Sequence, residues 1–400
     1  MRFQEAKQPF AIIASLFVTF EDLHFFGRNN PMSWKLRIIS LMLLITAALA
    51  ACRKDDVVPC PPEEAPDTDT GVRFNLNDIP YPKLSDYRFF VDTMVQLHPN
   101  SGVLPYDVIT PLFSDYAKKN RFIWMPSGVS AQYVSDREVL DFPNGTVMIK
   151  SFYYDNVQPL GERKVIETRL IYKKNNEWQF ADYIWNDEQT EAVYDSAGAY
   201  KMIEWIDANG TLRSVNYRIP SEVECYTCHK FNSTSTPIGP KPQNLNKVIS
   251  YDDGLANQLQ KWTEIGYLNG DYPSAIETVV DWTDETQTLE NRWRAYVDMN
   301  CSHCHREGSH CDYRPLRLAW SETTNPDNLG VCVQPQEVIP TQPQLTHIIA
   351  RSVINRSMMY YRLNATAEQE RMPLLGRTVV HEEAIALLEA YINSLTPTCP

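Results

Sequence analysis

The sequence predicts an α+β fold, in which a mostly antiparallel β domain precedes a mainly α-helical C-terminal region. Residues 71–218 contain alternating runs of branched and aromatic residues, such as 145–154 and 165–172, with Gly, Pro or Asn near their ends. Residues 289–300 and 380–395 instead place apolar residues at helical spacing. The order of these patterns predicts that the strands come first.

Composition limits the classes of protein to consider. The chain has 400 residues, which predicts two or three domains, and its hydrophobic fraction of 43% is ordinary for a globular protein with a core. The formal net charge of −13 argues against a nucleic-acid partner, because no basic stripe could neutralise phosphates.

An export signal is predicted at residues 32–52. A short basic segment precedes the apolar run 38–50, and residues 49–52 (Leu-Ala-Ala-Cys) resemble a bacterial lipobox. An uncleaved membrane helix is the alternative, but the apolar run is too short to span comfortably. We therefore expect a lipoprotein of the periplasm or cell envelope, anchored to the membrane by a lipid on Cys52.

Two further N-terminal segments follow from this signal. Residues 1–31 precede a complete signal peptide, so we expect them to reflect an over-extended gene start. Residues 53–70 are rich in Pro, Asp and Glu and are typical of a flexible tether.

The predicted β-rich domain, residues 71–218, contains no Cys and no recognisable catalytic cluster. Residues 207–210 (Asp-Ala-Asn-Gly) separate two strand-like runs and predict a hairpin turn. We expect the large aromatic residues of this domain to be core residues, namely Trp124, Trp178, Trp185 and Trp205.

Two C-x-x-C-H motifs follow this domain, and each places a His directly after the second Cys. This spacing is the signature of covalent c-type haem attachment. Each thiol adds to a haem vinyl group, and the His becomes the proximal ligand of the iron. The predicted haem-binding residues are Cys225, Cys228 and His229 in the first motif and Cys301, Cys304 and His305 in the second.

Zinc is the main alternative to haem. The four motif cysteines could form a four-thiolate site. The His after each second Cys argues against it, as does the predicted export, since oxidation would compete with free thiolates. Haem at only one of the motifs remains a further alternative.

The second haem region, residues 287–400, has the order helix, motif, Met-Pro, helix. Met372 is the expected sixth ligand of this haem iron, because a thioether opposite His raises the reduction potential into the electron-transfer range. Met358 and Met359 are the reserve candidates, and we expect His347 and His381 to be packing or surface residues.

The first haem region, residues 219–286, lacks such a methionine, since none occurs between His229 and Met299. The iron could take a distal ligand from elsewhere in the chain or remain five-coordinate. The candidates considered are Met125, Met202 and His98.

The remaining cysteines predict disulfides. Of nine cysteines, one would be lipidated and four would carry haem, which leaves Cys60, Cys311, Cys332 and Cys399. We expect a Cys311–Cys332 bond inside the haem region and, on weaker grounds, a Cys60–Cys399 bond near the two ends.

Residues 289–395 resemble a class I cytochrome c domain. Over residues 75–397 the chain resembles an uncharacterised family of bacterial exported diheme c-type cytochromes, on the strings 110–116 (TPLFSDY) and 183–192 (YIWNDEQTEA) and on Asn300. The resemblance implies two covalent haems per chain, with His229 and His305 as proximal ligands, and it assigns no substrate.

The sequence leaves three functions open. The favoured one is an electron carrier that exchanges single electrons with a redox partner protein. A diheme peroxidase-type enzyme, with an open distal site at the first haem, is the second. In the third, the β domain binds or assembles at the cell surface and the cytochrome portion connects it to a partner.

Overall fold

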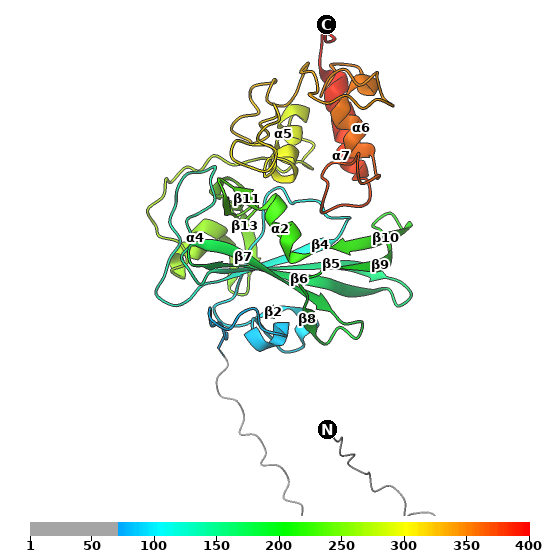
Figure 1. Ribbon diagram of the computed structural model, residues 1–400. Coiled ribbons are helices and arrows are strands. Elements are labelled where there is room, and N and C mark those ends of the chain that lie inside the picture. Colours follow the sequence, from blue (N-terminus) through cyan, green and yellow to red (C-terminus); the bar gives the residue numbers. More distant parts are fainter. Residues whose placement is uncertain (1–70) are drawn as a thin grey trace, which may run out of the picture. The chain divides into compact units, whose positions relative to one another are not determined.

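The computed structural model describes residues 71–400, and an eight-stranded antiparallel sheet is its largest element (Figure 1). The strand order is β10-β9-β5-β6-β7-β8, and β4 pairs with both β5 and β3. The strands are β3 (Leu104–Pro105), β4 (Lys118–Trp124), β5 (Val147–Val157), β6 (Glu162–Lys174), β7 (Glu177–Trp185), β8 (Ala192–Tyr194), β9 (Ala199–Ile206) and β10 (Leu212–Ile219). The predicted antiparallel β domain is confirmed.

The alternation of side chains explains why these strands form a sheet with two covered faces. Ile149 of β5, Leu170 of β6 and Ala181 of β7 are cross-strand partners, and all three are buried on one face. Met148 of β5 and Ile123 of β4 are partners on the opposite face. Successive residues of a strand point to opposite faces, so the near-continuous apolar runs in the sequence cover both.

The predicted turn at residues 207–210 is confirmed as the hairpin between β9 and β10. The Asp207 N–H donates to the Thr211 carbonyl (2.9 Å), and the Asp207 carboxylate accepts from the Asn209 N–H (2.9 Å). Gly210 has a φ of 77°, a conformation that glycine adopts without strain.

Different elements cover the two faces of the sheet (Figure 1). One face carries η2 (Leu84–Tyr87), η3 (Met94–Gln96), β1 (Phe90–Val91) and β2 (His98–Pro99). The other carries α2 (Glu222–Cys228), α3 (Pro242–Leu245), α4 (Gln258–Glu264) and the small hairpins β11 (Lys230–Phe231) with β12 (Thr234–Ser235) and β13 (Val248–Tyr251) with β14 (Gly254–Asn257). Trp178, Trp185 and Trp205 are buried as predicted, and Trp124 is partly buried.

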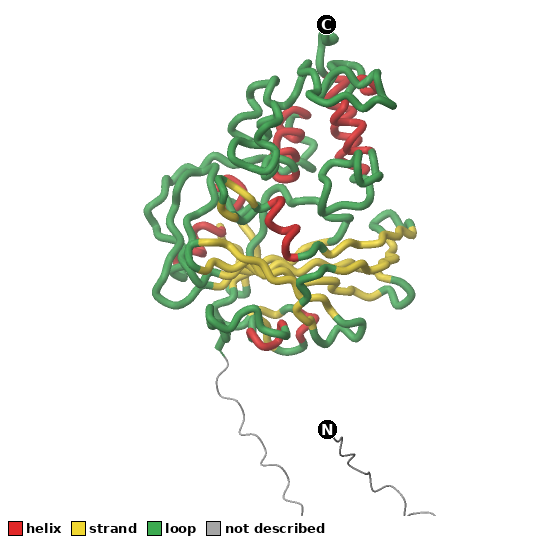
Figure 2. The backbone as a smooth tube through the Cα atoms, in the orientation of Figure 1, coloured by secondary structure: helices red, strands yellow, loops and turns green. Residues whose placement is uncertain are grey.

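The C-terminal region is more helical, as predicted, but long loops separate its helices (Figure 2). These are α5 (Leu289–Asn300), η4 (Ile354–Arg356), α6 (Met358–Asn364) and α7 (Glu382–Ser394). The Trp293 ring of α5 lies 6.4 Å from the Tyr391 ring of α7 within one shared core. Residues 301–353 contain only turns, bends and isolated β-bridges.

Three predictions lie outside the described residues, namely the start at 1–31, the lipoprotein signal at 32–52 with Cys52, and the tether at 53–70. Within residues 71–400, no helix has the length and apolar content needed to cross a membrane.

Candidate functional site

The first C-x-x-C-H motif lies at the C-terminal end of α2. A capping box begins this helix, because the Ser221 N–H donates to the Glu224 carboxylate (2.9 Å) and the Ser221 side chain accepts in return. Cys225 and Cys228 are three residues apart, so they lie on the same side of the helix. His229 is the residue at which the helix ends.

The His229 ring is oriented by the backbone of the following hairpin. Its Nδ1 lies 2.8 Å from the Thr236 carbonyl oxygen, which can only accept, so Nδ1 carries the proton and Nε2 keeps its lone pair. Burial lowers the pKa of His229 to about 3, so the ring is neutral near pH 7. The Phe180 ring packs against it at 4.8 Å. A neutral imidazole with Nδ1 bonded to a carbonyl is the form in which histidine binds metal through Nε2.

The second motif follows α5 directly. Thr288 caps this helix by accepting the Asn291 N–H (3.1 Å), and the helix buries its last eight residues. The turn after it is held by the Cys301 carbonyl, which accepts from the N–H groups of Cys304 (3.0 Å) and His305 (2.9 Å). Burial lowers the pKa of His305 to about 4, so this ring is also neutral near pH 7.

A cleft with an empty volume of about 800 Å³ adjoins the second motif. Cys301 and His305 line it together with all three predicted sulfur ligands, Met358, Met359 and Met372. Most of the other lining residues are apolar, among them Pro315, Leu316, Leu318, Pro335, Ile348 and Leu363. Thiol, imidazole and thioether donors in one apolar cleft fit the attachment and axial ligation of a haem.

The structure brings the two motifs together, which the sequence did not predict. The ligand atoms of Cys228, His303 and Cys304 all lie within 4.8 Å of one another, and all three residues are half-buried. A second cavity of about 540 Å³ is lined by residues of both motifs, including Thr227 and Cys228 from the first and Cys301, His303, Cys304 and His305 from the second. Met372 lines this cavity as well as the larger cleft.

The four-thiolate zinc site does not match this arrangement. The cluster that could hold a metal contains Cys228 and Cys304 but neither Cys225 nor Cys301. Cys225 is buried instead, and its thiol donates to the Ser221 carbonyl (3.6 Å). Any zinc ion here would therefore bind two of the four thiolates and His303.

The three distant candidates for the first distal ligand lie away from His229. Met202 is 68% exposed, whereas its neighbour Ile203 is buried in a core cluster with Trp205 and Tyr217. Met125 is buried in the cluster that contains Trp262. His98 belongs to β2, on the face of the sheet opposite α2, where it pairs with Asp92 at 3.3 Å (Figure 1). The structure does not bring these candidates to the first motif.

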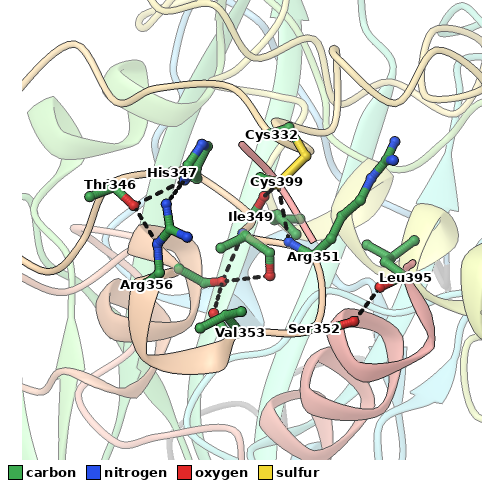
Figure 3. Close-up of a disulfide and its surroundings, with 12 residues drawn as sticks. Cys332, Thr346, His347, Ile349, Arg351, Ser352, Val353, Arg356, Leu395 and Cys399 are labelled. Carbon is green, nitrogen blue, oxygen red and sulfur yellow. Dashed lines mark hydrogen bonds between the residues drawn. A yellow bond between two sulfur atoms is a disulfide. The ribbon is translucent and has the colours of Figure 1, made fainter. Parts of the chain in front are cut away.

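The predicted Cys311–Cys332 disulfide is wrong. Cys332 is bonded to Cys399, with a Cα–Cα distance of 5.4 Å (Figure 3). Cys311 is a free, half-buried thiol. The Cys311 N–H donates instead to the Cys304 carbonyl (2.9 Å), which holds Cys311 beside the second motif. The bond to Cys332 also leaves Cys399 unable to pair with Cys60, which lies outside the described residues.

The string at residues 110–116 connects the sheet to the second motif. The Asn300 side-chain oxygen accepts the Phe113 N–H (2.8 Å). Asp115 is 2% exposed, and its carboxylate accepts from the Thr378 N–H (2.6 Å), the Thr378 hydroxyl (2.8 Å) and the Val379 N–H (3.0 Å). This segment thereby fixes the chain that follows Met372.

The sheet face that carries α2 also holds a group of cationic residues that the sequence did not predict, namely Lys119, Arg121, Lys150 and Arg169. In the sequence, each of these residues is only a charged residue at a position where the alternation predicts a buried apolar side chain. This occurs twice in β4 and once each in β5 and β6. Such a pattern cannot be recognised until the strands are paired.

Comparisons with models of known protein families, with curated proteins and with solved structures found no match for this chain.

Proposed function

We propose that this protein is an exported diheme c-type cytochrome lipoprotein that transfers single electrons through two covalently attached haems. The observation that carries the proposal is the cleft in which Cys301 and His305 face Met372 among apolar residues. The orientation of His229 by the Thr236 carbonyl supports the same role for the first motif. Bound haem would supply the reversible one-electron chemistry.

In this proposal each residue has a defined task. The thiols of Cys225, Cys228, Cys301 and Cys304 attach the two haems, and His229 and His305 are the proximal iron ligands. Met372 is the sixth ligand at the second haem, and the apolar cleft walls exclude water from it. The contact between Cys228 and Cys304 places the two attachment points side by side, which suits exchange of electrons between the two centres.

The proposed location is the periplasm or cell envelope, with a lipid on Cys52 as membrane anchor and an unidentified redox protein as partner. The Cys332–Cys399 disulfide supports export, because such bonds persist in oxidising compartments.

Two other functions have specific support. The absence of Met125, Met202 and His98 from the surroundings of His229 favours a peroxidase-type enzyme with an open distal site at the first haem. The close approach of Cys228, His303 and Cys304 favours a bound metal ion, such as zinc, in place of haem.

A pyridine haemochrome assay on denatured protein tests the proposal, after expression with the cytochrome c maturation machinery. Two covalent haems per chain are expected, falling to one in a Cys225→Ala/Cys228→Ala variant. A chain without haem, under conditions in which a control cytochrome matures, would overturn the proposal. Zinc that is bound at one ion per chain and lost in Cys228→Ala would then establish the metal site.

Peroxide turnover separates carrier from enzyme. The reduced, haem-loaded protein is mixed with hydrogen peroxide, and reoxidation of the haems is followed by absorbance. In an electron carrier, the reoxidation rate is expected to be low and to rise linearly with peroxide concentration. A rate at the first haem that saturates with peroxide concentration would identify the enzyme.

A further inference from the structure

His303 is the residue of the second motif that reaches the first. It belongs to the turn that the Cys301 carbonyl holds by accepting from the N–H groups of Cys304 and His305. One of its ring nitrogens lies within 4.8 Å of the sulfur atoms of Cys228 and Cys304. A side chain from the second motif therefore lies against a proposed haem attachment point of the first.

The two residues between Cys301 and Cys304 have different partners. Ser302 is 3% exposed, and its hydroxyl donates to the Asp298 carbonyl (2.5 Å) of α5. His303 instead lies towards the first motif. Its Nδ1 is buried and has no hydrogen-bond partner within residues 71–400. Because a buried polar atom without a partner costs stability, this ring indicates a site for a ligand.

Contacts between the segments that follow the two motifs hold His303 in this position. The hairpin of β11 and β12 packs on the loop after the second motif. The Arg306 guanidinium carbon lies 3.8 Å from the centroid of the Phe231 ring. Between the two strands, the Asn232 N–H donates to the Gly308 carbonyl (2.8 Å). The two motifs are thus fixed relative to each other, as a site built from both requires.

A cavity adjoins both His303 and the first motif. It has an empty volume of about 540 Å³, and Cys228 and His303 both line it. A haem bonded to the Cys228 sulfur begins at an atom that is already within 4.8 Å of a His303 ring nitrogen. Burial is the main cause of the low pKa of His229, and the charges of Lys150 and His303 lower it further. His303 is therefore close to His229 as well as to Cys228.

Of the two proposed haem irons, the first is the one that needs a further ligand. The axial positions of the second iron are assigned to His305 and Met372, which line the larger cleft, whereas His303 does not line it. The first iron has His229 alone, and the distant candidates for its other axial position lie away from it.

We propose that His303 is the distal iron ligand of the haem at the first motif, opposite His229. This inference rests on the proposed function, because it requires that haem. Imidazole on both sides of the iron fills the position that a peroxidase-type enzyme keeps open, so the inference favours the electron carrier. It also gives the first haem a lower midpoint potential than the second, since a thioether opposite His raises the potential.

Electron paramagnetic resonance of the oxidised, haem-loaded full-length protein tests the assignment. With two axial ligands on each iron, the wild type is expected to show two low-spin haems per chain. His303→Ala should convert one of them to high spin, and added imidazole should restore the low-spin signal. A wild type with one high-spin haem, or a His303→Ala variant with two low-spin haems, would overturn the proposal.

His310→Ala is the matched control, because His310 lines the same cavity and is exposed. It should retain two low-spin haems. A high-spin haem in this variant, with none in His303→Ala, would assign the ligand to His310 and overturn the proposal.

His303→Met keeps a ligand in place and serves if His303→Ala folds poorly. Both haems should then stay low-spin, and one midpoint potential should rise because a thioether replaces an imidazole. Two unchanged potentials would overturn the proposal.

A chain with one haem shows which iron His303 binds. The Cys225→Ala/Cys228→Ala variant is expected to keep only the second haem, and adding His303→Ala should leave that haem low-spin. A change to high spin in this chain would show that His303 binds the second iron, which would overturn the proposal.

The haemochrome assay distinguishes failure of this inference from failure of the proposed function. Two covalent haems per chain, one of them high-spin in the wild type, would leave the cytochrome standing, remove His303 as a ligand and favour the peroxidase-type enzyme. A first motif without covalent haem would overturn both proposals.

Discussion

The histidines proposed as proximal ligands, His229 and His305, differ in how they are held. The Nδ1 of His229 is bonded to a carbonyl, whereas the Nδ1 of His305 is buried without a hydrogen-bond partner among the described residues. A bonded Nδ1 fixes both the tautomer and the ring orientation. The orientation of His305 depends instead on packing and on the turn that the Cys301 carbonyl holds.

Three methionines line the cleft of the second motif, and single substitutions can identify the iron ligand. For the proposed haem at the second motif, we expect Met372→Ala to lower the midpoint potential by on the order of 0.1 V or more, because axial ligation sets the potential. Met358→Ala and Met359→Ala are the matched controls and should leave it nearly unchanged. A redox titration of each variant checks this. A lowered midpoint potential in Met358→Ala or Met359→Ala, and not in Met372→Ala, would assign the ligand to that methionine instead.

The burial of His381 predicts that the folded protein loses stability in acid. Its ring stacks on Phe113 at 3.9 Å, and burial, with the charges of Lys119 and Arg377, lowers its pKa to about 3. The unfolded chain takes up a proton near the ordinary value of 6.5 and the folded chain does not, so stability is lost as pH falls from about 6.5 towards 3.

The variant His381→Phe should remove this loss. Between pH 7 and 5 the wild type should lose about 1–2 kcal/mol more unfolding free energy than the variant. Urea unfolding of both proteins at each pH measures the difference. If the unfolding free energy of the two proteins depends equally on pH, His381 is protonated in the folded state, for instance by pairing with Glu383, whose carboxylate lies 3.7 Å away.

At the scale of elements, the loop that contains Asp115 joins the sheet to the C-terminal region. Asp115→Ala leaves the partly buried donors of Thr378 and Val379 without their acceptor, so we expect a loss of about 3 kcal/mol in unfolding free energy. Asp187→Ala is a control, because the Asp187 side chain is 86% exposed. Urea unfolding of both variants tests the prediction, and similar small losses would contradict it.

The sequence predicted those elements whose signal is local. The alternation in β5 and β6, the Asp-Ala-Asn-Gly turn and the helical spacing of α5 and α7 each lie within one segment, and the structure contains all of them. The group of cationic residues on the sheet was not predicted, because each strand contributes only one or two of its members. The disulfide was assigned wrongly because the sequence does not show that the tail returns to Cys332.

At the scale of the whole molecule, the fold brings distant segments together around the two motifs. Cys228 and Cys304 become neighbours across the chain, and Asn300 binds the backbone of Phe113, although the two are 187 residues apart. The β domain therefore supplies side chains and backbone to both motifs. It is an integral part of the candidate site.

The Cys332–Cys399 disulfide closes the C-terminal region, with a sequence separation of 67. Cross-linking a loop of this length restricts the unfolded chain, so Cys332→Ala/Cys399→Ala should cost about 2–5 kcal/mol of unfolding free energy. The tail would also lose its anchor beside Arg351, whose N–H donates to the Cys399 sulfur (3.3 Å). Cys311→Ala, which removes a free thiol, should leave stability nearly unchanged. Urea unfolding of the oxidised proteins measures both effects, and the opposite ranking would indicate that Cys311 forms the structural bond.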